Sequence, residues 1–229
     1  KIMNKKWTNE RKKTITKLKL VMGKLTASVR SDQYLLFEKH VDIKPSTTVL
    51  DVGVSSEEDI EGTNQFEKNY PYPGRLTLAT IENYKKLKRM YPYSKVKGIL
   101  PKKKLPFKKS EFDVVVSWAT LEHVGDYSDQ LNYINELLRV GKSVFITTPY
   151  RGCIYEPHSG LFFLHWLPLP IFRRVCIFLG KRFWSSKDNL NPLYVRDLTR
   201  MKFIKKVNFK IYNLFKVLPS HIIITSDNI

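Results

Sequence analysis

The feature that most constrains the fold is a regular alternation of strand-like and helix-like segments between residues 47 and 149. Short runs rich in Val, Ile, Leu and Thr, which are typical of buried strands, occur at residues 48–54, 75–82, 94–100, 113–120 and 142–149. Helix-like segments lie among them at residues 61–70, 83–91 and 127–140. Strands that alternate with helices at this spacing predict a parallel sheet with right-handed crossovers and helices on both faces.

The end of the chain departs from this alternation. Residues 206–217 and 221–226 read as two further strands joined by a short turn at Leu218-Pro219. That connection is too short for a crossover helix, so the two strands should pair antiparallel. The predicted fold class is therefore α/β: a doubly wound, mostly parallel seven-stranded sheet that ends in an antiparallel hairpin.

Local signals set the expected ends of the helices. Asn83 is expected to cap the helix at 83–91, and Gly141 to end the helix at 127–140 as a C-terminal glycine. Ser31-Asp32 is expected to cap a helix over residues 33–41. That helix should place four apolar side chains on one side, namely Tyr34, Leu35, Phe37 and Val41.

Composition suggests how the chain is divided. Residues 1–30 are dominated by Lys and Arg and read as a basic N-terminal arm or helix, or simply as a solvated flank. Residues 31–229 should form a single domain. Residues 150–200 are rich in aromatic residues and proline and show no clear strand, so we expect a helical, aromatic-rich insertion there.

Charge and cysteine content limit the partners and the compartment. The formal net charge of +19 attracts anionic partners such as nucleic acid or an acidic membrane surface, although a lysine-rich proteome would give the same excess. Cys153 and Cys176 have neither metal-site nor disulfide spacing, and no Cys-His or His-x-Glu metal pattern is present, so no metal is expected. We find no signal-peptide pattern and no apolar run of roughly 20 residues, and we expect a cytoplasmic protein.

Three segments, in order along the chain, carry a family resemblance. They are "VLDVGVSS" at 49–56, "LPFKKSEFDVVVSWATLEHV" at 105–124 and "INELLRVGKSVFITTPYR" at 134–151. The second segment is the most specific, because a Leu-Pro-Phe loop, the run "FDVV" and then "LEHV" rarely occur together. With these motifs, residues 30–229 resemble the class I S-adenosylmethionine-dependent methyltransferases of the type 11 group, which have a Rossmann-like fold.

The resemblance implies S-adenosylmethionine as cofactor and a set of residues that bind it. Asp51 matches the acidic residue that orders the cofactor turn, and Gly53 and Val54 form that turn. Glu82 stands where an acidic residue accepts from ribose hydroxyls. Asp51 could instead cap nearby amides, and Glu82 could be a solvated side chain or a helix cap. In this family, the segment Ser117, Trp118 and Ala119 flanks the methionine moiety.

Two departures from the family pattern concern the same pocket. Ser55 and Ser56 replace glycines, and the loop after the third predicted strand carries lysines 102–104 where the family often has an acidic residue that reads the adenine. The cofactor has no phosphate groups, so the turn needs only a close backbone approach, which Gly53 allows. Apolar walls would then hold the adenine, with Ile99, Leu100 and Leu105 as candidates.

Methyl transfer needs alignment of the reactants and removal of one proton from the acceptor. A histidine suits the proton transfer. The candidate catalytic residues are His123, His158 and Tyr150. His158 and His165 are seven residues apart, a spacing that would put both on one face of a helix, or they could be buried histidines beside Trp166. Glu122 is expected to cap a helix, and His123 could equally be buried and structural.

The insertion and the charge leave several functions open. The segment "LFFLHWLPLPIFRRVCIFLGKRFW" is apolar, aromatic and punctuated by Arg and Lys; it reads as a cap over the site, and also as a patch that lies on an anionic membrane. The expected activity is methyl transfer to a small-molecule, lipid-linked or glycan-linked acceptor. The alternatives are a catalytically silent binding or scaffold module and an RNA methyltransferase, the latter supported only by the basic charge. The sequence leaves the oligomeric state open.

Overall fold

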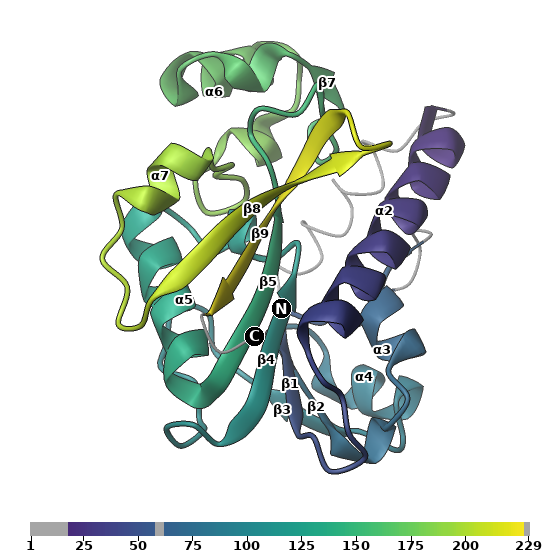
Figure 1. Ribbon diagram of the computed structural model, residues 1–229. Coiled ribbons are helices and arrows are strands. Elements are labelled where there is room, and N and C mark those ends of the chain that lie inside the picture. The colour runs from purple at the N-terminus through teal and green to yellow at the C-terminus, as the bar shows by residue number, and fades with distance from the viewer. Residues whose placement is uncertain (1–17, 58–61, 227–229) are drawn as a thin grey trace.

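The computed structural model of the protein describes residues 18–57 and 62–226, and its centre is a twisted seven-stranded sheet (Figure 1). The strands are β1 (Val49–Val52), β2 (Leu76–Thr80), β3 (Lys95–Gly98), β4 (Phe112–Trp118), β5 (Gly141–Pro149), β8 (Val207–Leu214) and β9 (Leu218–Ser226). Their order across the sheet is β3-β2-β1-β4-β5-β9-β8. The first five strands run parallel, whereas β9 is antiparallel to both β5 and β8. The predicted fold class is confirmed.

Helices cover both faces of the sheet. They are α2 (Leu18–His40), α3 (Gln65–Asn69), α4 (Tyr84–Met90), α5 (Tyr127–Val140), α6 (Leu169–Phe178) and α7 (Val195–Thr199). Short 3₁₀ turns connect them: η1 (Pro73–Arg75), η2 (Leu121–His123), η3 (Leu164–Trp166) and η4 (Arg182–Ser185). In Figure 1, α2, α3 and α4 lie on one side of the sheet and α5 and α7 on the other.

Two apolar cores form because successive strand residues point to opposite faces of the sheet. On β1, Leu50 and Val52 belong to the core under α5, whereas Val49 belongs to the core under α2, α3 and α4. Burial on both faces explains why β1, β2, β4 and β5 are mostly apolar along their whole length, whereas the edge strand β3 is mostly exposed and alternates Lys with Val and Gly.

The first described helix differs from its prediction. The helix expected over residues 33–41 is the second half of α2 (Leu18–His40), which passes through the predicted boundary at residue 30. Asp32 therefore lies inside the helix and does not cap it; its carboxylate accepts a hydrogen bond from the Tyr212 hydroxyl at 2.6 Å. Leu35 is 55% exposed and does not share the buried face of Tyr34 and Phe37. Residues 1–17 of the predicted basic arm lie outside the described residues.

One turn was predicted wrongly. Phe215 and Lys216, both with positive φ, lead the chain from β8 to β9, whereas Leu218 and Pro219 already belong to β9. A register shift beside Tyr212 lets the sheet accept Pro219, which has no N–H to donate.

The predicted helix ends are confirmed at two positions. Gly141 ends α5 as predicted, although its φ of −98° is extended, so the chain enters β5 directly. The caps at Asn83 and Asp126 are formed by their side chains.

The insertion has a small core of its own and lies beyond the carboxyl end of β5. It contains a two-stranded hairpin, β6 (Tyr155–Glu156) with β7 (Leu161–Phe162), which the sequence did not reveal. Its core is built from Phe172, Cys176, Phe183, Trp184 and Leu190. His158 lies in the hairpin loop and His165 in η3, so the prediction that the two histidines share a helix face is wrong.

Candidate active site

The candidate site begins with the turn after β1, at the sheet edge where open α/β folds bind ligands. Gly53 has φ +100°, and its amide and that of Val54 donate to the Ala79 carbonyl at 2.9 and 3.3 Å. A Cβ added to Gly53 would overlap the side chain of Thr120, which follows β4. Glycine is therefore required here for its conformation and for the close approach of Thr120.

Glu82 is held against this turn by the two serines that replace the family glycines. The Ser56 amide and hydroxyl donate to Glu82 Oε2 at 2.6 and 2.8 Å, and the Ser55 hydroxyl donates to the same oxygen at 3.3 Å. β2 ends at Thr80, whose hydroxyl accepts from the Glu82 amide at 3.0 Å. The serines thus fix an acidic side chain two residues beyond the end of β2.

Asp51, at the end of β1, is buried beside a second carboxyl group, that of Glu67 on α3. Burial and the neighbouring Glu67 raise the pKa of Asp51, and burial raises the pKa of Glu67 to about 7 against the opposing charge of Arg30 on α2. Arg30 also donates to the Gly62 carbonyl at 2.6 Å. Two adjacent buried carboxyl groups favour a state in which one proton is retained, and a bound cation would displace it.

The three predicted residues of the β4 end have different environments. The Ser117 hydroxyl is buried and contacts the Val52 carbonyl at 3.0 Å and the Tyr133 hydroxyl at 2.8 Å, so it ties β4 to β1 and α5. The Trp118 ring stacks on Phe66 with 5.5 Å between centroids. Its Nε1 is buried and has no hydrogen-bond partner among residues 18–57 and 62–226.

Ala119 has φ +48°, an uncommon conformation for a residue with a Cβ. This residue reverses the chain after β4, so that Thr120 reaches Gly53 and the following turn η2 comes next to β5. The strained conformation lies between the Gly53 turn and the histidine pair described below, and strained backbone of this kind is often found at functional sites.

The lysine-rich loop is directed away from the turn. Lys102 forms ion pairs with Asp129 of α5 and Asp188 of the insertion at 2.8 and 2.7 Å. Of the apolar residues expected to contact an adenine, Leu105 is buried, Ile99 is half-buried and Leu100 is 70% exposed. Lys102 thus links α5 of the sheet domain to the insertion.

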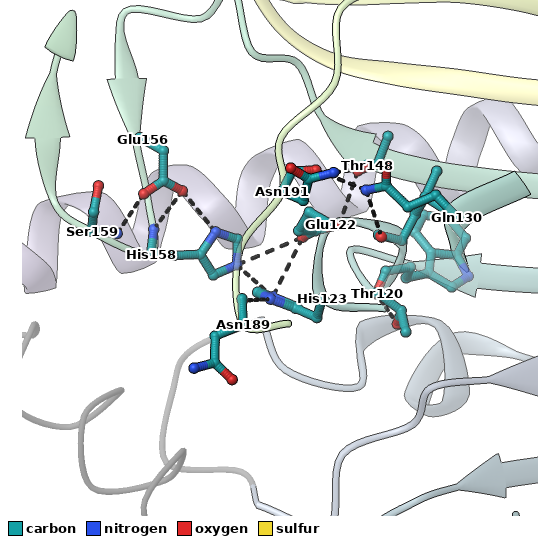
Figure 2. A network of polar contacts seen from close by, with 12 residues as sticks. Thr120, Glu122, His123, Gln130, Thr148, Glu156, His158, Ser159, Asn189 and Asn191 are labelled. Carbon is teal, nitrogen blue, oxygen red and sulfur yellow. Dashed lines mark hydrogen bonds and ion pairs between the residues drawn. The ribbon is translucent and has the colours of Figure 1, made fainter. Parts of the chain in front are cut away.

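Two predicted catalytic histidines, far apart in the sequence, lie against each other. The Nε2 atoms of His123 and His158 are 3.0 Å apart, and their ring planes are nearly perpendicular (Figure 2). His123 Nδ1 lies 2.6 Å from the Asn189 carbonyl, and His158 Nδ1 lies 2.8 Å from Glu156 Oε1. The turn η2 positions His123, and the hairpin loop of the insertion positions His158.

Two buried carboxylates flank the pair. Glu122 is fully buried; burial raises its pKa against the opposing charge of His158, and its Oε2 accepts from the Thr148 hydroxyl at 2.9 Å. Burial alone would also raise the pKa of Glu156, but His158 and the hydrogen bonds from Ser159 outweigh it and lower the pKa to about 2. Glu122 was expected to be a helix cap, whereas its side chain is directed toward the histidines (Figure 2).

The insertion docks on the domain through amide groups close to this pair. The backbone N–H of Asn191 donates to the backbone carbonyl of Glu122 at 2.7 Å. The buried side chain of Gln130 on α5 donates to the carbonyls of Asn191 and Leu121 at 2.7 and 3.1 Å. These bonds fix residues 189–191 over η2, so the insertion supplies both His158 and one wall of the site.

Comparison with known proteins agrees with this geometry. Residues 82–146 match a family model described as a methyltransferase domain. A structure of an S-adenosylmethionine-dependent methyltransferase from Methanosarcina mazei superposes with a TM-score of 0.52 and 14% identity, over 83% of this chain and 96% of that one. The chain has the fold of the class I S-adenosylmethionine-dependent methyltransferases. The resemblance inferred from the sequence motifs is confirmed.

Two other solved structures share the fold, and one of them is not named as a methyltransferase. Geranyl diphosphate C-methyltransferase from Streptomyces coelicolor, solved with Mg²⁺, geranyl diphosphate and S-adenosyl-L-homocysteine, has a TM-score of 0.52 and 13% identity, over 87% of this chain and 79% of that one. A Rhodobacter sphaeroides structure named for Zn-dependent alcohol dehydrogenases has a TM-score of 0.55 and 12% identity, over 81% and 85%. A search of curated sequences found no match. Identities this low establish the shared fold alone.

Other predicted residues of the methyltransferase-like chain have packing roles. The Tyr150 ring packs against Tyr194 at 5.9 Å and over Gly152. His165 is buried, and its Nε2 contacts the Cys153 carbonyl at 2.8 Å; burial lowers the pKa of His165, which keeps it neutral. Arg151 donates to the carbonyls of His165 and Leu167 and so braces the insertion.

Sequence reasoning missed several residues of the site. Arg30 lies in the part of the chain that was read as a basic arm, and Glu67 lies in the helix-like segment at 61–70. Neither residue belongs to a recognised motif. Asn189 acts through its backbone carbonyl and Gln130 through its side-chain amide. Such groups occur throughout any sequence, so they give no motif. The sequence offered one signal for such residues, namely a polar side chain at a position that should be apolar. Gln130, on the inner face of α5, is an example.

Proposed function

We propose that the protein is an S-adenosylmethionine-dependent methyltransferase whose cofactor lies between the β1 turn and Glu82. The observation that carries the proposal is the convergence of Gly53, Glu82 and the Asp51–Glu67 pair at the sheet edge where the fold binds ligands. Among the described residues, the three bonds to Glu82 all use Oε2, which leaves Oε1 for the ribose hydroxyls. The buried carboxyl pair suits the ammonium and sulfonium charges of the cofactor.

The residues of the β4 end would complete the cofactor site. Ala119 and Thr120 close over Gly53, and Trp118 offers a buried Nε1–H near the same turn. Ser117 contributes indirectly, because its hydroxyl holds the carbonyl of Val52 next to the turn. The serines in place of glycines are compatible with a cofactor that carries no phosphate.

The acceptor would be bound on the other side of η2, next to His123 and His158. His123 follows Thr120 by three residues, and together with His158 it forms the polar group next to which the proton of the acceptor would be removed. The insertion, which supplies His158 and residues 189–191, would form the acceptor pocket. We propose a small-molecule, lipid-linked or glycan-linked acceptor.

An exposed apolar surface on the insertion favours an acceptor at a membrane. The helix α6 and the residues around it expose Phe178 (88%), together with Phe162, Phe163, Trp166, Ile171, Ile177 and Leu179. Arg174 and Arg182 lie beside this surface, which we call the α6 patch, and would contact anionic head groups. No helix within residues 18–57 and 62–226 is long and apolar enough to cross a membrane, so contact would be peripheral.

Calorimetric titration with S-adenosylmethionine tests the proposal. We expect binding to the wild-type protein, and a loss of about 1–3 kcal/mol in binding free energy for Asp51→Ala and for Glu82→Ala, the usual cost of losing a hydrogen bond to a charged group. Asp42→Ala is the matched control, since Asp42 is exposed and precedes β1 at the opposite sheet edge. Absence of binding at millimolar cofactor would instead favour a catalytically silent scaffold.

A further inference from the structure

Three potential ligand atoms converge in the candidate site. His123 Nε2 and His158 Nε2 are 3.0 Å apart, and Glu122 Oε1 lies 3.7 Å from the first and 3.6 Å from the second (Figure 2). Glu122 and His123 come from η2, and His158 comes from the hairpin loop of the insertion. The two histidines are 35 positions apart in the sequence. No sequence spacing therefore indicated a metal, and none was predicted.

The hydrogen bonds around the histidines place their protons on the far side of each ring. The Asn189 carbonyl can only accept, so His123 Nδ1 must donate to it. Glu156 Oε1 lies 2.8 Å from His158 Nδ1 and also accepts from the His158 backbone amide at 3.0 Å, so this oxygen is an acceptor and His158 Nδ1 donates to it. In the neutral rings, both Nε2 atoms are then left with lone pairs that face each other.

The third atom adds another lone pair. Glu122 Oε1 is buried and has no hydrogen-bond partner within residues 18–57 and 62–226. A proton shared between the two Nε2 atoms would satisfy the histidines, but 3.6 and 3.7 Å are too long for a hydrogen bond to Glu122. A buried carboxylate oxygen without a partner is costly, so a proton leaves the arrangement incomplete.

A metal ion satisfies all three atoms at once. A point equidistant from three atoms at these separations lies about 2.0 Å from each, which agrees with the approximately 2.0–2.2 Å of Zn²⁺ bonds to imidazole nitrogen and carboxylate oxygen. Two histidines and one carboxylate are also the ligands of known catalytic zinc sites that keep a position open. We infer that Glu122, His123 and His158 bind one divalent transition-metal ion, with Zn²⁺ as the ion that best fits these ligands.

The surrounding contacts are those of a built metal site. A carboxylate or carbonyl that accepts from the distal nitrogen of a ligand histidine fixes its tautomer and orientation, and Glu156 and the Asn189 carbonyl do so here. The Thr148 hydroxyl holds the second oxygen of Glu122. The side chains of His123 and His158 are 15% and 17% exposed, so an ion would have access to solvent for its remaining positions.

The role of the ion in catalysis rests on the proposed methyl transfer, whereas its binding does not. A hydroxyl group of the acceptor bound at an open position would have a lowered pKa, and its proton would pass to water. With the ion bound, His123 and His158 would act as its ligands and not as the base, because both Nε2 lone pairs would be occupied. The oxygen would then form a bond to the methyl carbon as the carbon–sulfur bond breaks, with that electron pair remaining on the sulfur of S-adenosylhomocysteine. The site thus favours acceptors with a hydroxyl oxygen that can bind the ion.

Metal titration in the absence of any cofactor tests the inference. Protein stripped with a chelator and dialysed would be titrated with Zn²⁺ by calorimetry and with Co²⁺ by visible absorption. We expect one tight site per chain, with affinity lowered by about 100-fold or more in His158→Ala and by about 10–100-fold in Glu156→Gln, which changes only the partner of a ligand. His40→Ala is the control, since His40 is exposed on α2.

Two results would overturn the inference. Wild-type protein that takes up no stoichiometric ion would show that the histidines share a proton only. Uptake unchanged in His158→Ala, with melting curves that show both proteins folded, would place the ion elsewhere. Because S-adenosylmethionine binding would be measured in chelator and metal binding without cofactor, failure of either proposal is distinguishable from failure of the other.

Discussion

At the scale of single residues, the sequence predicted a cofactor turn after the first strand but not the charged residues that lie beside it. Asp51, Gly53 and Glu82 were found because a strand end, a glycine and a second strand end follow one another in a recognisable order. Arg30 and Glu67 approach the same point from helices, and the side on which a helix places one charged residue depends on tertiary packing. A burial-driven pKa such as that of Glu67 is a property of the folded structure alone.

The first prediction concerns the glycine of the turn. Gly53→Ala should destabilise the protein by about 2–4 kcal/mol, because a Cβ there meets a positive φ and also overlaps Thr120. Gly180→Ala is the matched control, since φ is +72° but no atom lies near the added Cβ; we expect a loss of about 1–2 kcal/mol. Urea unfolding measures both, and equal losses would contradict the role of Thr120.

The second prediction concerns pH. The pKa of Glu67 is raised in the folded protein, so its stabilising contribution is complete below the pKa of the unfolded chain and is lost as pH rises toward about 7. The unliganded protein should therefore lose about 1–3 kcal/mol between pH 4.5 and 7 relative to Glu67→Gln. The melting temperatures of both proteins across this range provide the measurement.

A cationic cofactor should reverse this pH effect. Its charge favours the ionised carboxyl pair, so the affinity of the wild-type protein for S-adenosylmethionine should increase from pH 6.0 to pH 7.2, with proton release. Calorimetry in two buffers of different ionisation enthalpy detects the released proton. If the affinity of the wild-type protein and that of Glu67→Gln depended on pH in the same way, Glu67 would not be the group that releases the proton.

At the scale of elements, the strands were predicted well and the connections poorly. Strands that are buried on both faces can be recognised in the sequence by their apolar composition. The helix α5 can be recognised by its periodic apolar face and by its caps. The extent of α2 was missed because its basic first half resembles a flank, and the β6–β7 hairpin was missed because two residues per strand give no periodicity. The site depends on that hairpin, so the meeting of His123 with His158 could not be predicted.

The third prediction concerns how the insertion is attached. Gln130→Leu should cost about 1–3 kcal/mol in the free energy of unfolding, because it removes the side-chain donor to the buried carbonyl of Asn191 and leaves the Leu121 carbonyl with only the Val124 amide at 3.4 Å. The Asn191 amide should also exchange its hydrogen faster. Asn132→Leu, at an exposed position on the same helix, should change stability by less than about 0.5 kcal/mol. Similar effects of the two variants would show that Gln130 does not attach the insertion.

At the scale of the whole molecule, the alternation of strands and helices and the short final connection predicted a parallel sheet with an antiparallel hairpin, whereas the order of the strands across the sheet comes from the structure. The net charge of +19 is independent of the fold and would attract an anionic partner of any kind. The structure adds the exposed α6 patch next to basic side chains. Charge and patch together favour an anionic membrane surface over a purely electrostatic partner such as RNA.

The fourth prediction follows from this patch. The protein should float with anionic vesicles at low salt and less with neutral vesicles, and Phe178→Ser should weaken binding about tenfold through the lost apolar contact. Phe215→Ser is the control, because Phe215 is 68% exposed in the turn between β8 and β9. Equal effects of the two substitutions would show that charge alone, rather than the α6 patch, drives binding.

The central claim is that the β1 turn holds S-adenosylmethionine. The most direct measurement is the electron density of crystals grown with S-adenosylhomocysteine. We predict density for the nucleoside next to Gly53, with its ribose hydroxyls within hydrogen-bond distance of Glu82. Density that places the ligand elsewhere, or a Gly53 turn closed by side chains at saturating ligand, would contradict the account.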